Sequence, residues 1–150
     1  MTRPEYIYVV VIASPPEAVW EGLTSPEFTK QYWHRTNVSS DFKIGSRIEF
    51  ITEDGHIGCE GEILSIDYPA ELSFTWQFPR NPETSMEPPS RVTFHLEPIA
   101  TGTRLTVIHD QFIDSSKMYE LIEPGWPLVI CGLKTLLESG TAVDFSAEHG

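Results

Sequence analysis

The chain has 150 residues, and its 22 acidic and 10 basic side chains give a formal net charge of −12. This charge disfavours nucleic acid and membranes as partners, because phosphates and anionic lipids attract basic protein surfaces. No signal peptide and no bilayer-spanning apolar run is seen, so we expect a cytoplasmic protein. Cys59 and Cys131 stand far apart and no histidine pair has metal-ligand spacing, so neither a disulfide framework nor a metal or cofactor site is expected.

The N-terminal part predicts a strand followed by two short helices. Tyr6 to Ala13 is rich in Val, Ile and Tyr, which is typical of a buried strand. Ser14 is expected to cap the first helix, with Pro15 in its first position and Glu17 completing a capping box. The second helix is expected to begin at Ser25-Pro26-Glu27.

From about residue 36 to 112, apolar residues recur at every second position, which predicts an antiparallel meander with one apolar face. The pattern is clearest in Leu72, Phe74, Trp76 and Phe78, and it returns at Val92, Phe94 and Leu96 and at Leu105, Val107 and His109. Gly58 and Gly61 interrupt one strand and indicate a bulge or a thin position there.

The C-terminal third predicts a long amphipathic helix that covers the apolar face of the sheet. Its apolar residues run from Trp126 to Leu137 at helical spacing, and we expect the helix to begin at residues 123–125 and to end at Ser139-Gly140. The expected fold class is α+β, with a single domain over residues 1–140 and a tail over residues 141–150. The order of elements is that of a helix-grip fold.

The segment Ala13-Ser-Pro-Pro-Glu-Ala-Val-Trp20, continuing to Trp33, resembles the N-terminal signature of the heat-shock-protein-90 ATPase activator homologue-like proteins. These belong to the START-like (SRPBCC, Bet v 1-like) superfamily. Similar motifs follow at residues 60–69, 72–76, 90–97, 103–109, 125–128 and 133–138. The resemblance implies a curved antiparallel sheet, two short N-terminal helices and a long C-terminal helix over the sheet.

The resemblance also suggests functions. Superfamily relatives carry lipids, plant hormones or polyketides between sheet and long helix, and a few perform cyclase or hydrolase chemistry there. We therefore expect a non-enzymatic protein that holds a small apolar or amphipathic ligand in a hydrophobic cavity. The expected lining residues are Trp33, Phe50, Trp76, Phe94, His109, Trp126 and Ile130. Small residues such as Gly132 would leave room for this cavity, but they can equally permit close packing, and the same pattern would also fit a solid core.

No specific catalytic motif is present, and His109 is a weak candidate for an acid, a base or a ligand anchor. The alternative is a buried histidine that is satisfied by Asp110, Ser115 or a backbone carbonyl. Cys131 is expected to be an inert packed thiol.

Three further possibilities remain open from the sequence. An enzyme could act in the same cavity, or the chain could be a co-chaperone-like partner of the heat-shock protein 90 ATPase, and an exposed edge strand could support a homodimer. The segments Pro79 to Pro89 and Gln111 to Pro124 are either portal loops of the cavity or ordinary connections.

Overall fold

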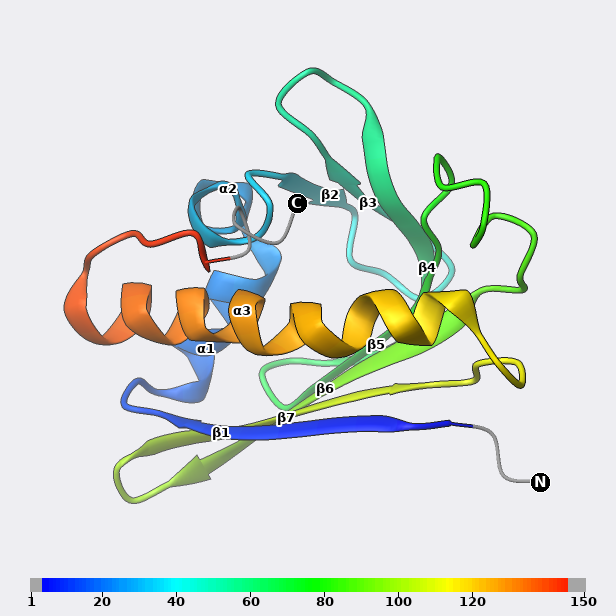
Figure 1. The fold of residues 1–150 in the computed structure, drawn as a ribbon. Coiled ribbons are helices and arrows are strands. Elements are labelled where there is room, and N and C mark those ends of the chain that lie inside the picture. Colours follow the sequence, from blue (N-terminus) through cyan, green and yellow to red (C-terminus); the bar gives the residue numbers. More distant parts are fainter. Residues whose placement is uncertain (1–3, 146–150) are drawn as a thin grey trace.

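A computed structural model describes residues 4–145 of the chain (Figure 1). Its elements follow the order β1 (Tyr6–Ile12), α1 (Pro16–Thr24), α2 (Pro26–Tyr32), β2 (Asn37–Ser40), β3 (Arg47–Ile51), β4 (Ile57–Asp67), β5 (Glu71–Trp76), β6 (Ser90–Ile99), β7 (Gly102–Asp110) and α3 (Lys117–Ser139). The strands form one curved antiparallel sheet, and α3 lies across one of its faces (Figure 1). The predicted helix-grip fold is confirmed.

The sheet order is β1-β7-β6-β5-β4-β3-β2, so the first strand pairs with the last. Tyr6 lies opposite His109 in this pairing, and Ile12 lies opposite Thr103. Alternation places Leu105, Val107 and His109 of β7 on the covered face, where each is fully buried. The predicted meander therefore has the predicted apolar side turned toward α3.

The start of α1 differs from the prediction. Pro15 occupies the N-cap position with extended backbone, Pro16 is the first helical residue, and no side chain caps the helix. The reason lies in the Pro-Pro pair, because a residue that precedes proline is sterically excluded from the helical region. Ser14 instead accepts a hydrogen bond at its carbonyl from the Thr103 hydroxyl, at 2.7 Å.

Helix α3 begins at Lys117, earlier than the predicted start at residues 123–125, and Ser116 caps it by accepting from the Tyr119 amide. Pro124 and Pro127 lie inside the helix. They deprive the carbonyls four residues earlier of their partners, but Glu120 and Glu123 are exposed, so water can satisfy those carbonyls. More than half of the segment Gln111 to Pro124, the second expected portal or connection, is therefore helix.

Two glycines bring elements into close contact. A Cβ atom on Gly132 would lie 2.7 Å from the Cβ atom of Tyr32, so the glycine lets α3 pack against α2. Of the two alternatives for Gly132, the structure shows close packing, and the glycine does not leave room for a cavity. A Cβ atom on Gly61 would lie 1.7 Å from the Thr75 carbonyl oxygen, which confirms a thin position in β4. Nearby, the strand register shifts between Ile63 and Ser65.

Candidate functional site

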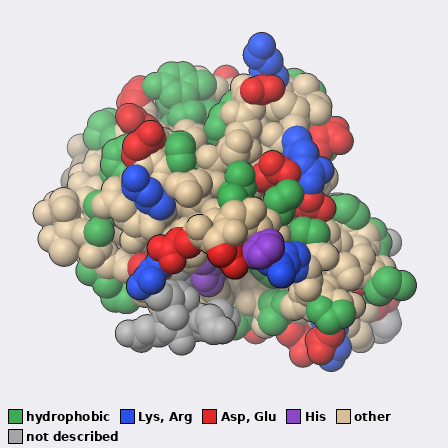
Figure 2. Space-filling view, turned by 90° about the horizontal axis from the view of Figure 1, so that it is seen from above, with side chains coloured by type: hydrophobic (Ala, Val, Ile, Leu, Met, Phe, Trp, Pro, Cys, Tyr) green, Lys and Arg blue, Asp and Glu red, His purple; other side chains and the backbone are tan. Residues whose placement is uncertain are grey.

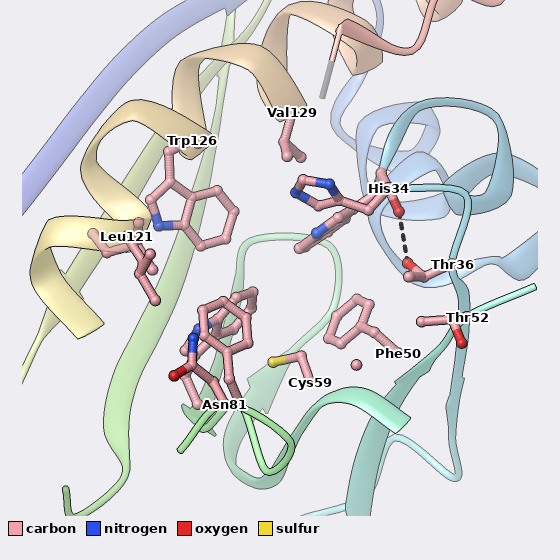
Figure 3. A pocket seen from close by; sticks show the side chains of 15 residues that line it. His34, Thr36, Phe50, Thr52, Cys59, Asn81, Leu121, Trp126 and Val129 are labelled. Carbon is pink, nitrogen blue, oxygen red and sulfur yellow. Dashed lines mark hydrogen bonds between the residues drawn. The ribbon is translucent and has the colours of Figure 1, made fainter. Parts of the chain in front are cut away.

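A cavity of about 330 Å³ lies between the sheet and the N-terminal half of α3 (Figure 3). This volume is at the lower end of the range of small-molecule sites. The cavity is lined by Trp33, His34, Thr36, Phe50, Thr52, Gly58, Cys59, Trp76, Phe78, Asn81, Leu121, Ile122, Gly125, Trp126 and Val129. Figure 3 shows Trp126 and Val129 projecting from α3 on one side, with Phe50 across from them on the sheet.

Four buried aromatic rings form the floor and walls. Trp33 follows α2, Phe50 lies on β3, Trp76 ends β5 and Trp126 lies on α3, and none is more than 4% exposed. The ring centroids of Trp33 and Phe50 are 4.6 Å apart, and those of Trp76 and Trp126 are 5.3 Å apart. Because each ring packs against others from different elements, the walls are fixed by the fold itself.

A tight turn after α2 places Trp33 and the polar side of the mouth. His34 and Arg35 both have positive φ angles, of 49° and 53°, and the chain reverses there into β2. The Thr36 hydroxyl donates to the Trp33 carbonyl at 2.7 Å, which closes the turn (Figure 3). His34 is exposed and Asn81 is half-buried, so polar groups border the opening while the interior is apolar.

The lining carries no Asp, Glu, Lys or Arg side chain among the described residues. Cys59 is the buried sulfur in the wall, and burial raises the pKa of its thiol well above the ordinary value. The thiol is therefore neutral near neutral pH. The cavity presents a mainly apolar surface to any occupant.

His109 lies behind this wall and is fully buried. Its Nδ1 accepts from Trp126 Nε1 at 3.0 Å, and its Nε2 lies 2.7 Å from Ser90 Oγ. Because the indole can only donate, Nε2 carries the proton and donates to Ser90. Desolvation lowers the pKa of His109 to about 3, so the ring is neutral.

The partners expected for His109 were wrong, although a satisfied buried histidine is what the structure contains. Asp110 forms a salt bridge with Arg91 at 2.7 Å instead, because alternation turns it to the other face of the sheet. An acid or base at His109 would also need a path to solvent, and the side chain has no exposed surface. His109 fixes the Trp126 indole in place.

Of the seven residues expected to line the cavity, Trp33, Phe50, Trp76 and Trp126 do so. Phe94, His109 and Ile130 are buried but do not line it. Phe94 packs behind the wall, with its ring centroid 5.9 Å from that of Trp126.

Several lining residues were missed by the sequence reasoning. Leu121 and Ile122 precede Trp126 by five and four positions, so extending the helical stripe through Pro124 would have found them. His34 and Asn81 lie outside regular helices and strands, where no periodic signal exists.

The prediction that Cys131 is a packed thiol was wrong, because this residue is exposed.

Other site classes find no counterpart in the described part of the chain. Within residues 4–145, no group of three or more His, Cys, Asp or Glu side chains is arranged to hold a metal ion. No helix in this range combines the length and apolar character needed to cross a membrane. Acidic and basic side chains are interspersed on the face shown in Figure 2.

Solved structures with the same fold are known from several organisms. The protein MLL2253 from Mesorhizobium loti is 27% identical with a TM-score of 0.75, and the match covers 92% of this chain and 99% of that chain. The Aha1 dimer from Colwellia psychrerythraea is 17% identical with a TM-score of 0.74, covering 92% and 98%. PFC0360w, an HSP90 activator from Plasmodium falciparum, is 17% identical with a TM-score of 0.70, covering 89% and 95%.

No curated protein matches the sequence. The family profile described as "Activator of Hsp90 ATPase homolog 1-like protein" matches residues 13–138, which span α1 to the end of α3. The chain therefore belongs to the family of Activator of Hsp90 ATPase homolog 1-like proteins.

Proposed function

We propose that the protein binds a small, uncharged, mainly apolar molecule in the cavity between the sheet and α3. The observation that carries the proposal is the mainly apolar interior, whose described lining has no Asp, Glu, Lys or Arg side chain, beneath a polar opening. Moving the apolar surface of a ligand from water into such a lining is favourable, and the polar groups at the opening can hydrogen-bond the polar end of an amphipathic ligand.

The open hollow supports this proposal. Larger side chains at this place could bury more apolar surface, so the hollow is the kind of feature that function retains against stability.

Gly125 adds a second line of support. It lies inside α3, where glycine destabilises a helix by about 1 kcal/mol relative to alanine. A Cβ atom there would meet no atom within 4 Å, so packing does not require the glycine. Because Gly125 lines the cavity, a side chain at this position would narrow the space that a ligand uses.

The neutral fluorophore 1-aminoanthracene provides a direct test, because its emission increases in an apolar site. We expect the wild-type chain and Gly125→Ala to bind it, and Gly125→Phe to lose binding because the ring occupies the cavity. The alanine variant controls for the change in helix propensity. Equal binding by Gly125→Phe, or no binding by the wild-type chain, would contradict the proposal.

A partnership with an Hsp90-type ATPase is the second candidate function, and the family description favours it. One structural neighbour is described as an HSP90 activator. Measuring the ATPase rate of Hsp90 with and without this protein tests the candidate, and an unchanged rate at saturating protein counts against it. Cyclase- or hydrolase-like chemistry at His109 gains no such support, because both ring nitrogens are engaged and the side chain is buried.

A further inference from the structure

A second, more open hollow adjoins the cavity. It is lined by Gly58, Phe78, Arg80, Asn81, Pro82, Glu83 and Leu121. The inner cavity shares four of these residues, which are Gly58, Phe78, Asn81 and Leu121. The two spaces therefore meet at these four residues, and we call this junction the neck. Among the four, only Asn81 has a side chain that forms strong hydrogen bonds, and Figure 3 shows it on the loop that follows β5.

The loop fixes the orientation of the Asn81 side-chain amide. Its Oδ1 accepts a hydrogen bond from the Glu83 backbone amide at 2.9 Å, and because a backbone N–H can only donate, the other polar atom of the side chain is the nitrogen. The loop is held in turn by Thr84, which is fully buried and donates from its hydroxyl to the Phe78 carbonyl at 3.2 Å. Pro82 restricts the backbone directly after Asn81. The Asn81 nitrogen is therefore held in a defined direction.

This nitrogen is a donor with no partner in the protein. Within residues 4–145, Asn81 Nδ2 forms no hydrogen bond. It is not among the fully buried polar atoms that lack a partner, so it keeps accessible surface on a side chain that is half-buried. Because Asn81 lines both spaces, its N–H groups are available to an acceptor that lies at the neck.

The charges around the neck favour a neutral acceptor. Arg80 and Glu83 line the outer hollow, and neither forms a salt bridge within the described residues. One cation and one anion give this hollow no preference for either sign of charge. The described lining of the inner cavity has no Asp, Glu, Lys or Arg side chain, so an ion placed there would lose its hydration without a counter-charge.

We propose that Asn81 Nδ2–H donates a hydrogen bond to the ligand, which is a neutral amphipathic molecule with a compact apolar body and a carbonyl-type oxygen at one end. The apolar body lies in the inner cavity and the oxygen lies at the neck. This inference rests on the proposed function and names both the class of molecule and the residue that orients it. The cavity accommodates a hydrocarbon of the same shape as well, but Asn81 discriminates against it because it has no acceptor.

The probes 2-adamantanone and adamantane form a matched pair, because they share a cage and differ by one carbonyl oxygen. The chain has two asparagines, Asn37 and Asn81, and Asn37 lines neither space. In an ¹H–¹⁵N NMR titration of the wild-type chain, we expect a side-chain amide proton of Asn81 to move downfield with 2-adamantanone but not with adamantane. The side-chain signals of Asn37 are expected to stay in place. This titration does not depend on any variant folding.

Asn81→Asp keeps the oxygen that accepts from the Glu83 amide and replaces the donor by a second oxygen. We expect displacement of bound 1-aminoanthracene to show that the wild-type chain prefers 2-adamantanone over adamantane by about fivefold, and that Asn81→Asp loses this preference. Ser85→Asp is the matched control for the added charge, because Ser85 is exposed on the same loop and lines neither space. It is expected to retain the preference for 2-adamantanone.

The outcomes separate the two proposals. Equal affinity for both probes, together with Asn81 amide signals that do not move downfield with 2-adamantanone, overturns the role of Asn81 and leaves the binding cavity in place. A preference that survives in Asn81→Asp overturns this role, and so does a preference that Ser85→Asp loses to the same extent. Displacement by neither probe contradicts the proposed function itself.

Discussion

The substitution Gly125→Ala should stabilise the protein, and its size follows from the surroundings of the residue. Gly125 lies within α3, and a Cβ atom there would have no neighbour within 4 Å. The full difference in helix propensity is therefore available, about 1 kcal/mol in the free energy of unfolding. For a chain of this length, that corresponds to an increase in Tm of about 2–4 °C.

Gly132→Ala is the comparison that makes this prediction sharp. It is the same substitution in the same helix, but its Cβ atom would lie 2.7 Å from Tyr32 Cβ and 3.1 Å from the Val143 carbonyl oxygen. Overpacking of this kind typically costs about 1–3 kcal/mol, which exceeds or cancels the propensity gain. Gly132→Ala should therefore not be stabilising.

Urea unfolding followed by circular dichroism measures both variants, with the midpoint compared at constant m-value. We expect a higher midpoint for Gly125→Ala than for the wild-type chain, and a lower or unchanged one for Gly132→Ala. A destabilised Gly125→Ala variant would contradict this prediction, because it would mean that the position is packed. An equal increase of the urea midpoint in Gly125→Ala and Gly132→Ala would also contradict it.

Three further predictions concern other parts of the molecule. Glu87→Ala should lower the free energy of unfolding by about 1–2 kcal/mol in the same urea assay. The reason is that the Glu87 carboxylate accepts hydrogen bonds from the Ser116 hydroxyl and the Lys117 amide at the start of α3. An unchanged urea midpoint would show that these two hydrogen bonds do not stabilise the protein. The pKa of His109 is about 3 in the folded protein and about 6.5 in the unfolded chain. Its contribution to stability is therefore present above about pH 6.5, and the free energy of unfolding falls by up to about 1.4 kcal/mol per pH unit as the pH drops toward 3. An imidazole NMR signal of His109 that titrates near pH 6.5 in the folded protein would contradict this prediction. A homodimer through the exposed edge strand β1 predicts that the wild-type chain sediments as a dimer and Val9→Lys as a monomer, because the Val9 side chain is 54% exposed on that strand; a monomeric wild-type chain in sedimentation analysis would exclude this dimer.

The sheet was predictable because its signal is local and repeated. Phe74 and Trp76 alternate with polar neighbours, and the period of two assigns both the strand and its buried face. The two short helices were predictable for a similar reason, although the Pro-Pro pair moved the first start by one residue. Family resemblance supplied the arrangement of these elements.

The start of α3 could not be predicted from the same rules. Pro124 and Pro127 resemble helix-start signals, and local reasoning cannot show that exposed carbonyls make an internal proline tolerable. The role of Gly132 could not be predicted from local rules either. Whether a glycine leaves space or allows contact depends on what faces it, and Tyr32 comes from a helix one hundred residues earlier.

The candidate site was also only partly predictable from the sequence. Strand and helix periodicity placed Phe50, Trp76 and Trp126 on the covered face, and the family resemblance supplied the expectation of a cavity there, with Trp33 among its expected lining residues. The indole N–H of Trp126 donates to His109, whereas that of Trp76 has no partner within residues 4–145. This difference was not predicted, because it depends on where the His109 ring lies in three dimensions.

Native mass spectrometry of protein purified without organic solvent tests the central claim, that the cavity holds a small molecule. We expect an excess mass over the polypeptide that disappears on denaturation, and that is absent from Gly125→Phe prepared in the same way. A bare polypeptide mass for the wild-type chain, unchanged after incubation with cell extract, would contradict it.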